Sequence, residues 1–150
     1  PDEGLKLLDG AIAGIHSSHR QDKKTITNRL MSAINSPFIQ VISHPTGRLL
    51  NQRESYEADW PRVFAACAKT KTILEINAYP SRLDLPDVLV KEAIKSGVEL
   101  IINTDSHQLN QMDNMKFGVA VARRGWAEKE DIINTFPWER FKKYFNVKST

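Results

Sequence analysis

The sequence predicts an α/β fold in which parallel strands alternate with helices. Four short apolar runs, rich in β-branched residues, are spaced along the chain, and segments with helical spacing separate them. The runs are almost continuously apolar, which is typical of strands buried on both faces of a parallel sheet. They cover residues 11–19, 39–47, 72–80 and 99–107.

The segments between these runs have the apolar spacing and the terminal residues of helices. Three of them cover residues 23–35, 59–70 and 85–98. Asp59 and Asp87 are placed to cap the second and third, and Gly97 to end the third. After His107 the sequence predicts further helices over residues 108–125, 127–136 and 137–145. We expect residues 147–150 to form a loose tail.

Length and composition restrict the class of protein. The 150 residues suffice for one domain with a real core, and no internal repeat or Gly/Ser-rich linker divides them. The single cysteine, Cys67, cannot form an intrachain disulfide and fits a reducing, cytoplasmic compartment. No apolar run reaches the roughly 18 residues of a membrane span, so we expect no membrane association. The net charge of +3 is compatible with a nucleic-acid or phosphate ligand without requiring one.

Polar residues capable of chemistry stand where each apolar run ends. His16 and His44 end the first two runs, Glu75 and Asn77 the third, and Asp105 with His107 the fourth. In parallel α/β folds ligands gather at the carboxyl ends of the strands, because the loops there converge on one face. Neutral imidazole nitrogens and carboxylate oxygens suit zinc, manganese or iron.

Each of these residues also has an ordinary structural interpretation. Pro45 could restrain His44 to an extended backbone within a turn, and Asp105 could form an Asx-turn that caps the following helix. Glu75 could pair with a nearby lysine or arginine, or orient a ligand. The convergence of three histidines and two carboxylates on one rim favours a metal site over all of these interpretations together.

Two further residues are weaker candidates. His19 lies three residues past His16 in a basic run, and we expect it on a solvent-facing loop. Cys67 stands at apolar spacing in a helical segment, which predicts a buried small side chain rather than a nucleophile.

Several segments resemble the PHP (polymerase and histidinol phosphatase) phosphoesterases, and above all the PHP domain of bacterial and archaeal X-family DNA polymerases. They are "GIHSS", "ISHPTGRLLNQRESYEADW", "LEINAYPSRLDLPD", "INTDSHQLNQMDNMKFGVAVARRGW" and "NTF". Together they extend over most of the chain, to about Phe136. "HPTGRLL" and "LEINAYPSRLDL" are specific to the polymerase-linked branch, whereas "TDSH" marks only the superfamily. Ser43 and Ser106 replace the glycine and alanine usual in this branch, and His19 stands where an aromatic residue is common.

The resemblance implies a distorted (β/α)7 barrel with up to three divalent metals, manganese or zinc. Its metal ligands map onto His16, His44, Asp105 and His107, and the last two would act directly in catalysis. Arg48 is a candidate for the substrate phosphate, with a structural role as the alternative. Glu75, Asn77 and Arg82 match family positions near the substrate. The implied activity is hydrolysis of DNA phosphate esters, as a 3′–5′ exonuclease and a 3′-phosphatase in DNA repair.

The family's opening histidine motif, a further histidine and a bridging glutamate have no counterpart in these residues. We therefore expect residues 1–150 to be the C-terminal portion of a PHP domain, without its N-terminal metal-binding motif and without the polymerase domains. From this portion alone we expect impaired catalysis, and dimerisation or aggregation through exposed strand edges. DNA would be bound through the parent polymerase.

Two other functions remain open. One is a small-molecule phosphatase of the histidinol phosphatase type, and the other is a PHP barrel that binds or scaffolds without catalysis. The four candidate metal ligands present here, His16, His44, Asp105 and His107, argue against the second.

Overall fold

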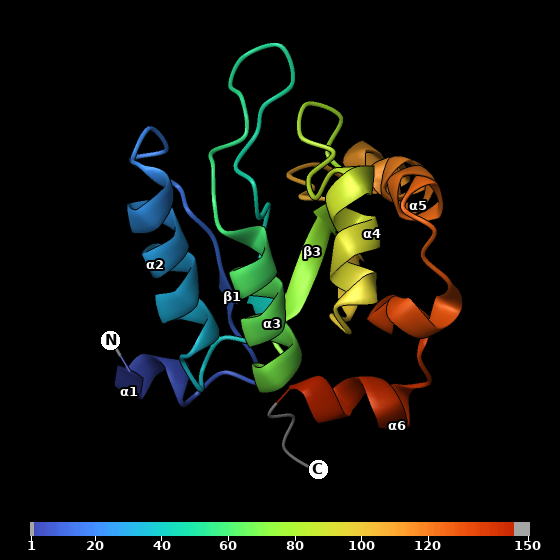
Figure 1. Cartoon of the computed structure of the whole chain (residues 1–150). Helices are drawn as coiled ribbons and strands as arrows, with labels where there is room; N and C mark the ends of the chain where they lie inside the picture. Colours follow the sequence, from blue (N-terminus) through green and yellow to red (C-terminus); the bar gives the residue numbers. More distant parts are fainter. Residues whose placement is uncertain (1, 146–150) are drawn as a thin grey trace.

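The computed structural model describes residues 2–145, which form a four-stranded parallel sheet with helices packed against it (Figure 1). The strands follow one another in the order β1 (Ile12–Ala13), β2 (Val41–Ile42), β3 (Ile73–Asn77) and β4 (Leu100–Asn103). All three strand pairs are parallel. The α/β prediction is confirmed, and the arrangement is that of part of a (β/α) barrel. The strands are shorter than the predicted runs, because each run also contains the start of the following loop.

Helices connect the strands and continue beyond the last one. They are α1 (Asp2–Leu5), α2 (Lys23–Ile34), α3 (Trp60–Thr70), α4 (Asp87–Lys95), α5 (Met115–Arg124) and α6 (Trp138–Phe141). Short 3-10 turns complete the chain: η1 (Leu109–Asn114), η2 (Lys129–Asp131), η3 (Ile133–Thr135) and η4 (Lys142–Tyr144). The predicted tail, residues 147–150, lies outside the described residues.

The helix predicted over residues 127–136 is wrong. Ile132 separates η2 from η3 with an extended backbone (φ −112°, ψ 107°). It is extended because it forms a parallel bridge with Leu100 of β4. A residue that pairs with a strand cannot at the same time continue a helix, so the segment breaks into two single turns.

The helix caps follow the sequence in part. The carboxylate of Asp59 accepts a hydrogen bond from the Arg62 backbone N–H at 3.3 Å, as an N-cap should. Asp87 is not the cap of α4: Pro86 occupies that position, and Asp87 is the first helical residue. Its carboxylate instead pairs with Arg124 at 2.8 Å and so ties α4 to α5.

Strands β2, β3 and β4 are buried on both faces, as the continuous apolar runs predict, whereas β1 is partly exposed. Leu74 and Ile76 point toward the helical layer, where they join the larger core cluster. The alternate residue Ile73, together with Ile101, points to the opposite face and packs against aromatic side chains of the C-terminal segment. These aromatic residues are Phe136, Phe141, Tyr144 and Phe145.

The two edges of the sheet differ. The outer edge of β4 is covered, because Asn134 accepts from the Ile102 N–H at 2.7 Å and donates to the Ile102 carbonyl at 3.1 Å. No strand among residues 2–145 pairs with the outer edge of β1, where Ile12 is 56% exposed. The expectation of exposed strand edges is therefore correct for β1 and wrong for β4. Every helix within residues 2–145 is too short or too polar to span a bilayer.

Removing the Asn134 amide should uncover the edge of β4. In Asn134→Ala the Ile102 N–H and carbonyl lose their partners, and we expect the free energy of unfolding to fall by about 1–2 kcal/mol. Urea unfolding and amide hydrogen exchange of Ile102 would measure the effect. Asn28→Ala, on the exposed face of α2, is the matched control and should change stability by less than about 0.5 kcal/mol. Equal stability of the two variants would contradict the role of Asn134.

Candidate functional site

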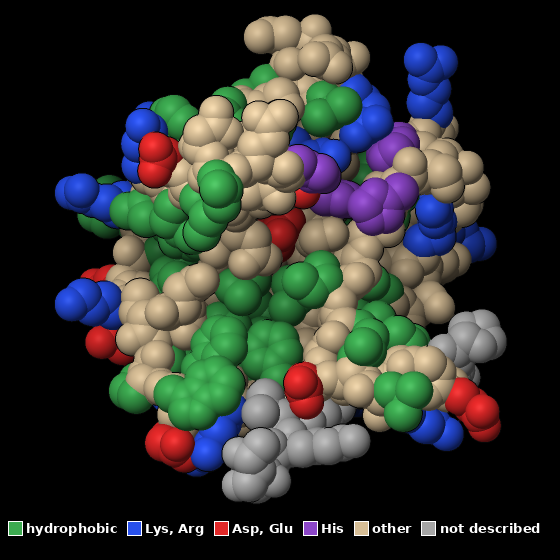
Figure 2. Space-filling model, turned by 180° about the vertical axis from the view of Figure 1, so that it is seen from behind, with side chains coloured by type: hydrophobic (Ala, Val, Ile, Leu, Met, Phe, Trp, Pro, Cys, Tyr) green, Lys and Arg blue, Asp and Glu red, His purple; other side chains and the backbone are tan. Residues whose placement is uncertain are grey.

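The loops at the carboxyl ends of the strands bring the predicted site residues to one edge of the sheet. His16 follows β1, His44 follows β2, Glu75 lies within β3, and Asp105 follows β4. Figure 2 shows histidine side chains gathered beside lysine and arginine side chains on the face seen from behind, above a mainly apolar area. Residues that are up to 89 positions apart in the sequence thus meet because the parallel sheet aligns the ends of its strands.

His16 and His44 form a close pair. Their ring centroids lie 4.9 Å apart with an interplanar angle of 87°. Gly14 leaves room for both rings, because a Cβ there would lie 2.7 Å from His44 Cε1 and 3.1 Å from His16 Nε2. It would also lie 2.5 Å from Ser43 Oγ. A side chain at position 14 would therefore displace the imidazole pair.

His44 adopts an unusual backbone conformation in a buried position. The turn considered for this segment is present, because the Gly47 N–H donates to the His44 carbonyl at 3.0 Å. The extended backbone expected for His44 before Pro45 is wrong, since its φ is positive, at 31°. Non-glycine residues held in such conformations cost on the order of 1–3 kcal/mol and cluster at functional sites.

The His44 imidazole has the properties of a metal ligand. Its Nδ1 is buried and has no hydrogen-bond partner in the described structure. Burial, followed by the charges of Arg82 and His16, lowers the pKa of His44 to about 4. The ring is therefore neutral at physiological pH, which is the form that binds a metal ion.

Glu75 connects the ends of three strands. Its carboxylate accepts hydrogen bonds from the His44 N–H at 2.6 Å, from Asn77 Nδ2 at 3.1 Å and from Asn103 Nδ2 at 2.8 Å. Burial raises the pKa of Glu75, while these three donors oppose the rise. No lysine or arginine pairs with it in the described residues, so the ion-pair interpretation is wrong. The carboxylate orients its neighbours instead.

Asp105 is held on one oxygen. Asn77 Nδ2 donates to its Oδ2 at 3.2 Å, and Arg82 Nε lies 3.3 Å from the same atom. The backbone of Asp105 also has a positive φ, of 52°. Asp105 does not cap the next helical turn, because Gln108 occupies the N-cap of η1. His107 is exposed, with its Nδ1 2.9 Å from the Asp105 carbonyl oxygen.

The two arginines named from the sequence have different surroundings. Arg48 donates from Nε to the Arg82 carbonyl at 2.8 Å and from Nη2 to the Leu83 carbonyl. Its guanidinium therefore holds the backbone of the neighbouring loop, as the alternative structural role of Arg48 requires. Arg82 points to Asp105, and its Nη1 is buried without a hydrogen-bond partner in the described residues.

The prediction for His19 is wrong and the prediction for Cys67 is confirmed. His19 is partly buried rather than solvent-facing, with Nε2 3.0 Å from the Ile15 carbonyl oxygen. Cys67 is fully buried in α3, and burial raises the pKa of its thiol to about 12, which confirms an unreactive side chain.

Asp84 is a buried carboxylate that the sequence reasoning missed. Both of its oxygens lie 3.1 Å from the Thr46 N–H, so it fixes the turn after His44 to the loop after β3. Burial raises its pKa to about 6, although the Thr46 hydrogen bonds and the charge of Arg48 oppose this rise. The sequence signal was available, since an aspartate between Leu83 and Leu85 in an apolar context is expected to have a buried partner.

The donor set fits part of a metal site. In residues 2–145 no three His, Cys, Asp or Glu side chains are grouped closely enough to hold a metal ion. Within that limit, the unpartnered His44 Nδ1 and the adjacent His16 ring are suitable nitrogen donors, and Asp105 offers its second oxygen. The arrangement can therefore contribute ligands without forming a complete coordination shell.

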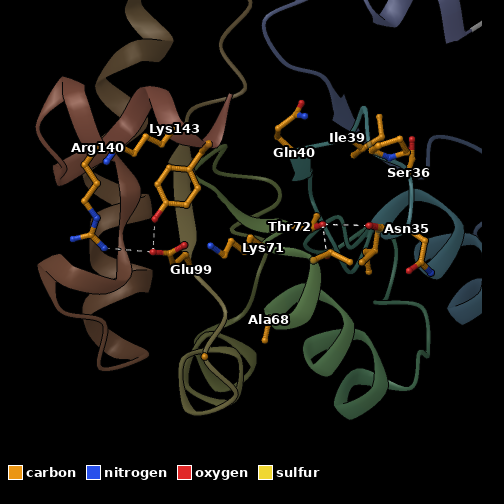
Figure 3. Close-up of a pocket in the computed structure, with 15 residues that line it drawn as sticks. Asn35, Ser36, Ile39, Gln40, Ala68, Lys71, Thr72, Glu99, Arg140 and Lys143 are labelled. Carbon is orange, nitrogen blue, oxygen red and sulfur yellow. Dashed lines mark hydrogen bonds and ion pairs between the residues drawn. The ribbon is translucent and has the colours of Figure 1, made fainter. Parts of the chain in front are cut away.

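A cavity at the opposite end of the strands is separate from this site. It has a volume of about 820 Å³ and is lined by residues next to the amino ends of the strands, including Gln40, Thr72 and Glu99 (Figure 3). Glu99 there accepts from the Tyr144 hydroxyl at 2.5 Å and lies 3.5 Å from Arg140. None of the predicted site residues lines it. In folds of this kind the amino-end face contributes stability rather than chemistry.

A parallel α/β sheet with histidines and an aspartate at its carboxyl edge is typical of metal-dependent hydrolases. Comparisons with known proteins narrow this class. The chain is 43% identical over 133 residues to the DNA polymerase/3′-5′ exonuclease PolX of Bacillus subtilis. The aligned region covers 89% of this chain and 23% of PolX. The resemblance to the PHP domain of X-family DNA polymerases, stated from the sequence, is thereby confirmed.

Other relatives are named probable phosphatases. One from Shewanella sediminis is 27% identical over 141 residues, covering 89% of this chain and 55% of the relative. One from Caldanaerobacter subterraneus is 23% identical over 157 residues, covering 99% of this chain and 59% of the relative. No family profile matches the chain. The chain spans less than a quarter of the polymerase and little more than half of these phosphatases.

The raised pKa of Asp84 predicts a pH-dependent stability. The native state binds the Asp84 proton more tightly than the unfolded chain, in which the pKa of this carboxyl is near 3.8. Folding is therefore favoured at low pH. As the pH rises from about 4 to about 6, this group should lower the free energy of unfolding by about 3 kcal/mol.

Asp84→Asn should remove this dependence. Urea unfolding from pH 4 to 7.5 would measure the free energy of unfolding of both proteins. As the pH rises, this free energy should fall in the wild type relative to the variant. Asp113→Asn, at an exposed carboxylate of η1, is the control and should follow the wild-type curve. Parallel curves for wild type and Asp84→Asn would show that Asp84 has an ordinary pKa.

Proposed function

We propose that this chain is the C-terminal portion of a PHP phosphoesterase domain of an X-family DNA polymerase, and that the complete domain hydrolyses phosphate esters at DNA 3′ ends. The observation that carries the proposal is that His16, His44 and Asp105 follow strands of one parallel sheet at the same edge, in a chain 43% identical to PolX. PolX is named as a polymerase and a 3′-5′ exonuclease. The relatives named probable phosphatases support phosphoester hydrolysis more generally.

The residues would divide among up to three divalent metals, manganese or zinc. His16 and His44 would hold one, Asp105 would help to hold another, and His107 would bind a third. Such metals, when bound, neutralise phosphate oxygens and lower the pKa of a coordinated water. The further ligands that each metal needs would come from the N-terminal portion of the domain.

The chain's own residues would prepare the site and bind the phosphate. Glu75 positions His44 and Asn77, and Asn77 in turn positions Asp105. Arg82, whose side chain is 20% exposed, would contact a phosphate oxygen through its guanidinium. Arg48 would act through Arg82, whose carbonyl it holds.

A small-molecule phosphatase is the second candidate function, and the names of the phosphatase relatives favour it. The sequence identity to PolX is higher than the identity to these phosphatases. We therefore rank hydrolysis of DNA above hydrolysis of small phosphate esters. A scaffold without catalysis would have no need for a buried, unpartnered imidazole nitrogen next to a second histidine.

The function is tested on the full natural protein that contains these residues. With Mn²⁺ it should release nucleotides from a DNA 3′ end and phosphate from a 3′-phosphorylated end, and EDTA should abolish both activities. Asp105→Asn, which tolerates the positive φ, should lower kcat by at least about 100-fold, whereas Asp113→Asn should leave it unchanged. The 150 residues alone should show little activity. Hydrolysis of small phosphate esters without any action on DNA would favour the second candidate.

The roles of the two arginines can be separated by phosphate binding. In a titration with inorganic phosphate, the Nε–H resonance of Arg82 should shift and that of Arg48 should not. Arg82→Lys should weaken phosphate binding about tenfold, because lysine lacks the planar fork of donors. Arg48→Lys should lower the free energy of unfolding by about 1 kcal/mol through the lost carbonyl contact. A phosphate-dependent shift of Arg48 Nε alone would reverse the assignment.

A further inference from the structure

A second, smaller cavity lies beside the candidate site. Its volume is about 350 Å³, at the lower end of the range of about 300–1,000 Å³ for small-molecule pockets. One wall comes from the loop after β3 and the other from η1. The lining residues are Tyr79, Pro80, Ser81, Asn110, Gln111 and Asn114.

The side chains that line this cavity are uncharged. Three side-chain amides, one hydroxyl group, one proline ring and one tyrosine line it, and no acidic or basic side chain does. Within residues 2–145 no hydrogen bond uses the side chains of Asn110, Asn114 or Tyr79. Gln111 accepts the His107 N–H at 2.7 Å through its Oε1, so its NH₂ group keeps its donors. The cavity therefore combines an aromatic side chain with unused donors and acceptors.

The position of the cavity links it to the site. The turn that begins at Tyr79 also carries Arg82, whose N–H donates to the Tyr79 carbonyl at 2.8 Å and whose side chain reaches Asp105. The opposite wall is continuous with His107, which Gln111 fixes. One turn of backbone thus joins the Tyr79 wall of the cavity to Arg82.

We propose that this cavity receives a nucleobase, namely that of the nucleotide whose phosphate lies at the sheet edge. A base has a flat face, which stacks on an aromatic ring, and edges with both donors and acceptors, which amide side chains match. A small aliphatic phosphate ester has no flat face that could stack on the ring. The inference rests on the proposed function and deepens it, because it assigns the residues that would receive the base of the terminal nucleotide.

The test is binding of nucleosides, which contain no phosphate and need no metal. Titration of the full natural protein that contains these residues with thymidine and with adenosine should shift the side-chain amide resonances of Asn110 and Asn114. Ribose and inorganic phosphate should leave these resonances unchanged. Tyr79→Leu should weaken nucleoside binding about tenfold, given that stacking contributes about 1–3 kcal/mol per base. Phe117→Leu, at a partly exposed aromatic residue that does not line the cavity, is the matched control and should bind as wild type.

A second variant protects the test against misfolding. Asn114→Ala removes one amide without touching the tyrosine, and it should weaken binding of both nucleosides while the urea midpoint stays within error of wild type. Absence of shifts with either nucleoside, or equal affinity of wild type and Tyr79→Leu, would overturn the inference. Nucleoside binding without hydrolysis of any phosphate ester by the full natural protein would support the cavity and contradict the proposed function. Hydrolysis of phosphate esters without nucleoside binding would support the proposed function and contradict the role of the cavity.

Discussion

The Glu75 carboxylate is the interaction on which the candidate site depends. It is 4% exposed and accepts three hydrogen bonds, one from the loop after β2, one from its own strand and one from β4. A buried carboxylate is tolerated only when its oxygens are satisfied, so each of these donors must remain in place. The same bonds fix the backbone of His44 and the amide of Asn77, and through Asn77 the side chain of Asp105. A group that is itself remote from solvent therefore sets the positions of the groups that face the ligand.

Much of the fold could be predicted from the sequence, because hydrophobic periodicity directly reports which faces are buried. The four apolar runs, their parallel pairing and the cap at Asp59 follow from local residue types. The break at Ile132 could not be predicted, since it depends on a bridge to Leu100, 32 positions away. Asp87 was placed one residue off for a related reason. A capping residue and a first-turn acid look alike in sequence, and the contact with Arg124 distinguishes them only in the folded chain.

The candidate site was predictable as a set of residues but not as a geometry. Strand-end placement brought His16, His44, Glu75 and Asp105 together, as the parallel sheet requires. The positive φ of His44 and of Asp105 was not predicted, because histidine and aspartate adopt it more often than most residues but still rarely. The interaction of Arg48 with the carbonyls of Arg82 and Leu83 was equally hidden, since a "TGRLL" segment does not reveal where its guanidinium reaches.

The contacts between the loops after β2 and β3 have a consequence for how a ligand would be received. Arg48 holds the carbonyls of Arg82 and Leu83, Asp84 holds the Thr46 N–H, and the Leu50 N–H donates to the Ser81 carbonyl at 2.6 Å. Two segments joined at so many points keep little independent conformational freedom. Binding at their rim would then lose little further conformational entropy, which is the main benefit of a preorganised site. The polar contacts between these loops thus contribute to affinity by restricting the free protein, although most of the atoms involved never meet the ligand.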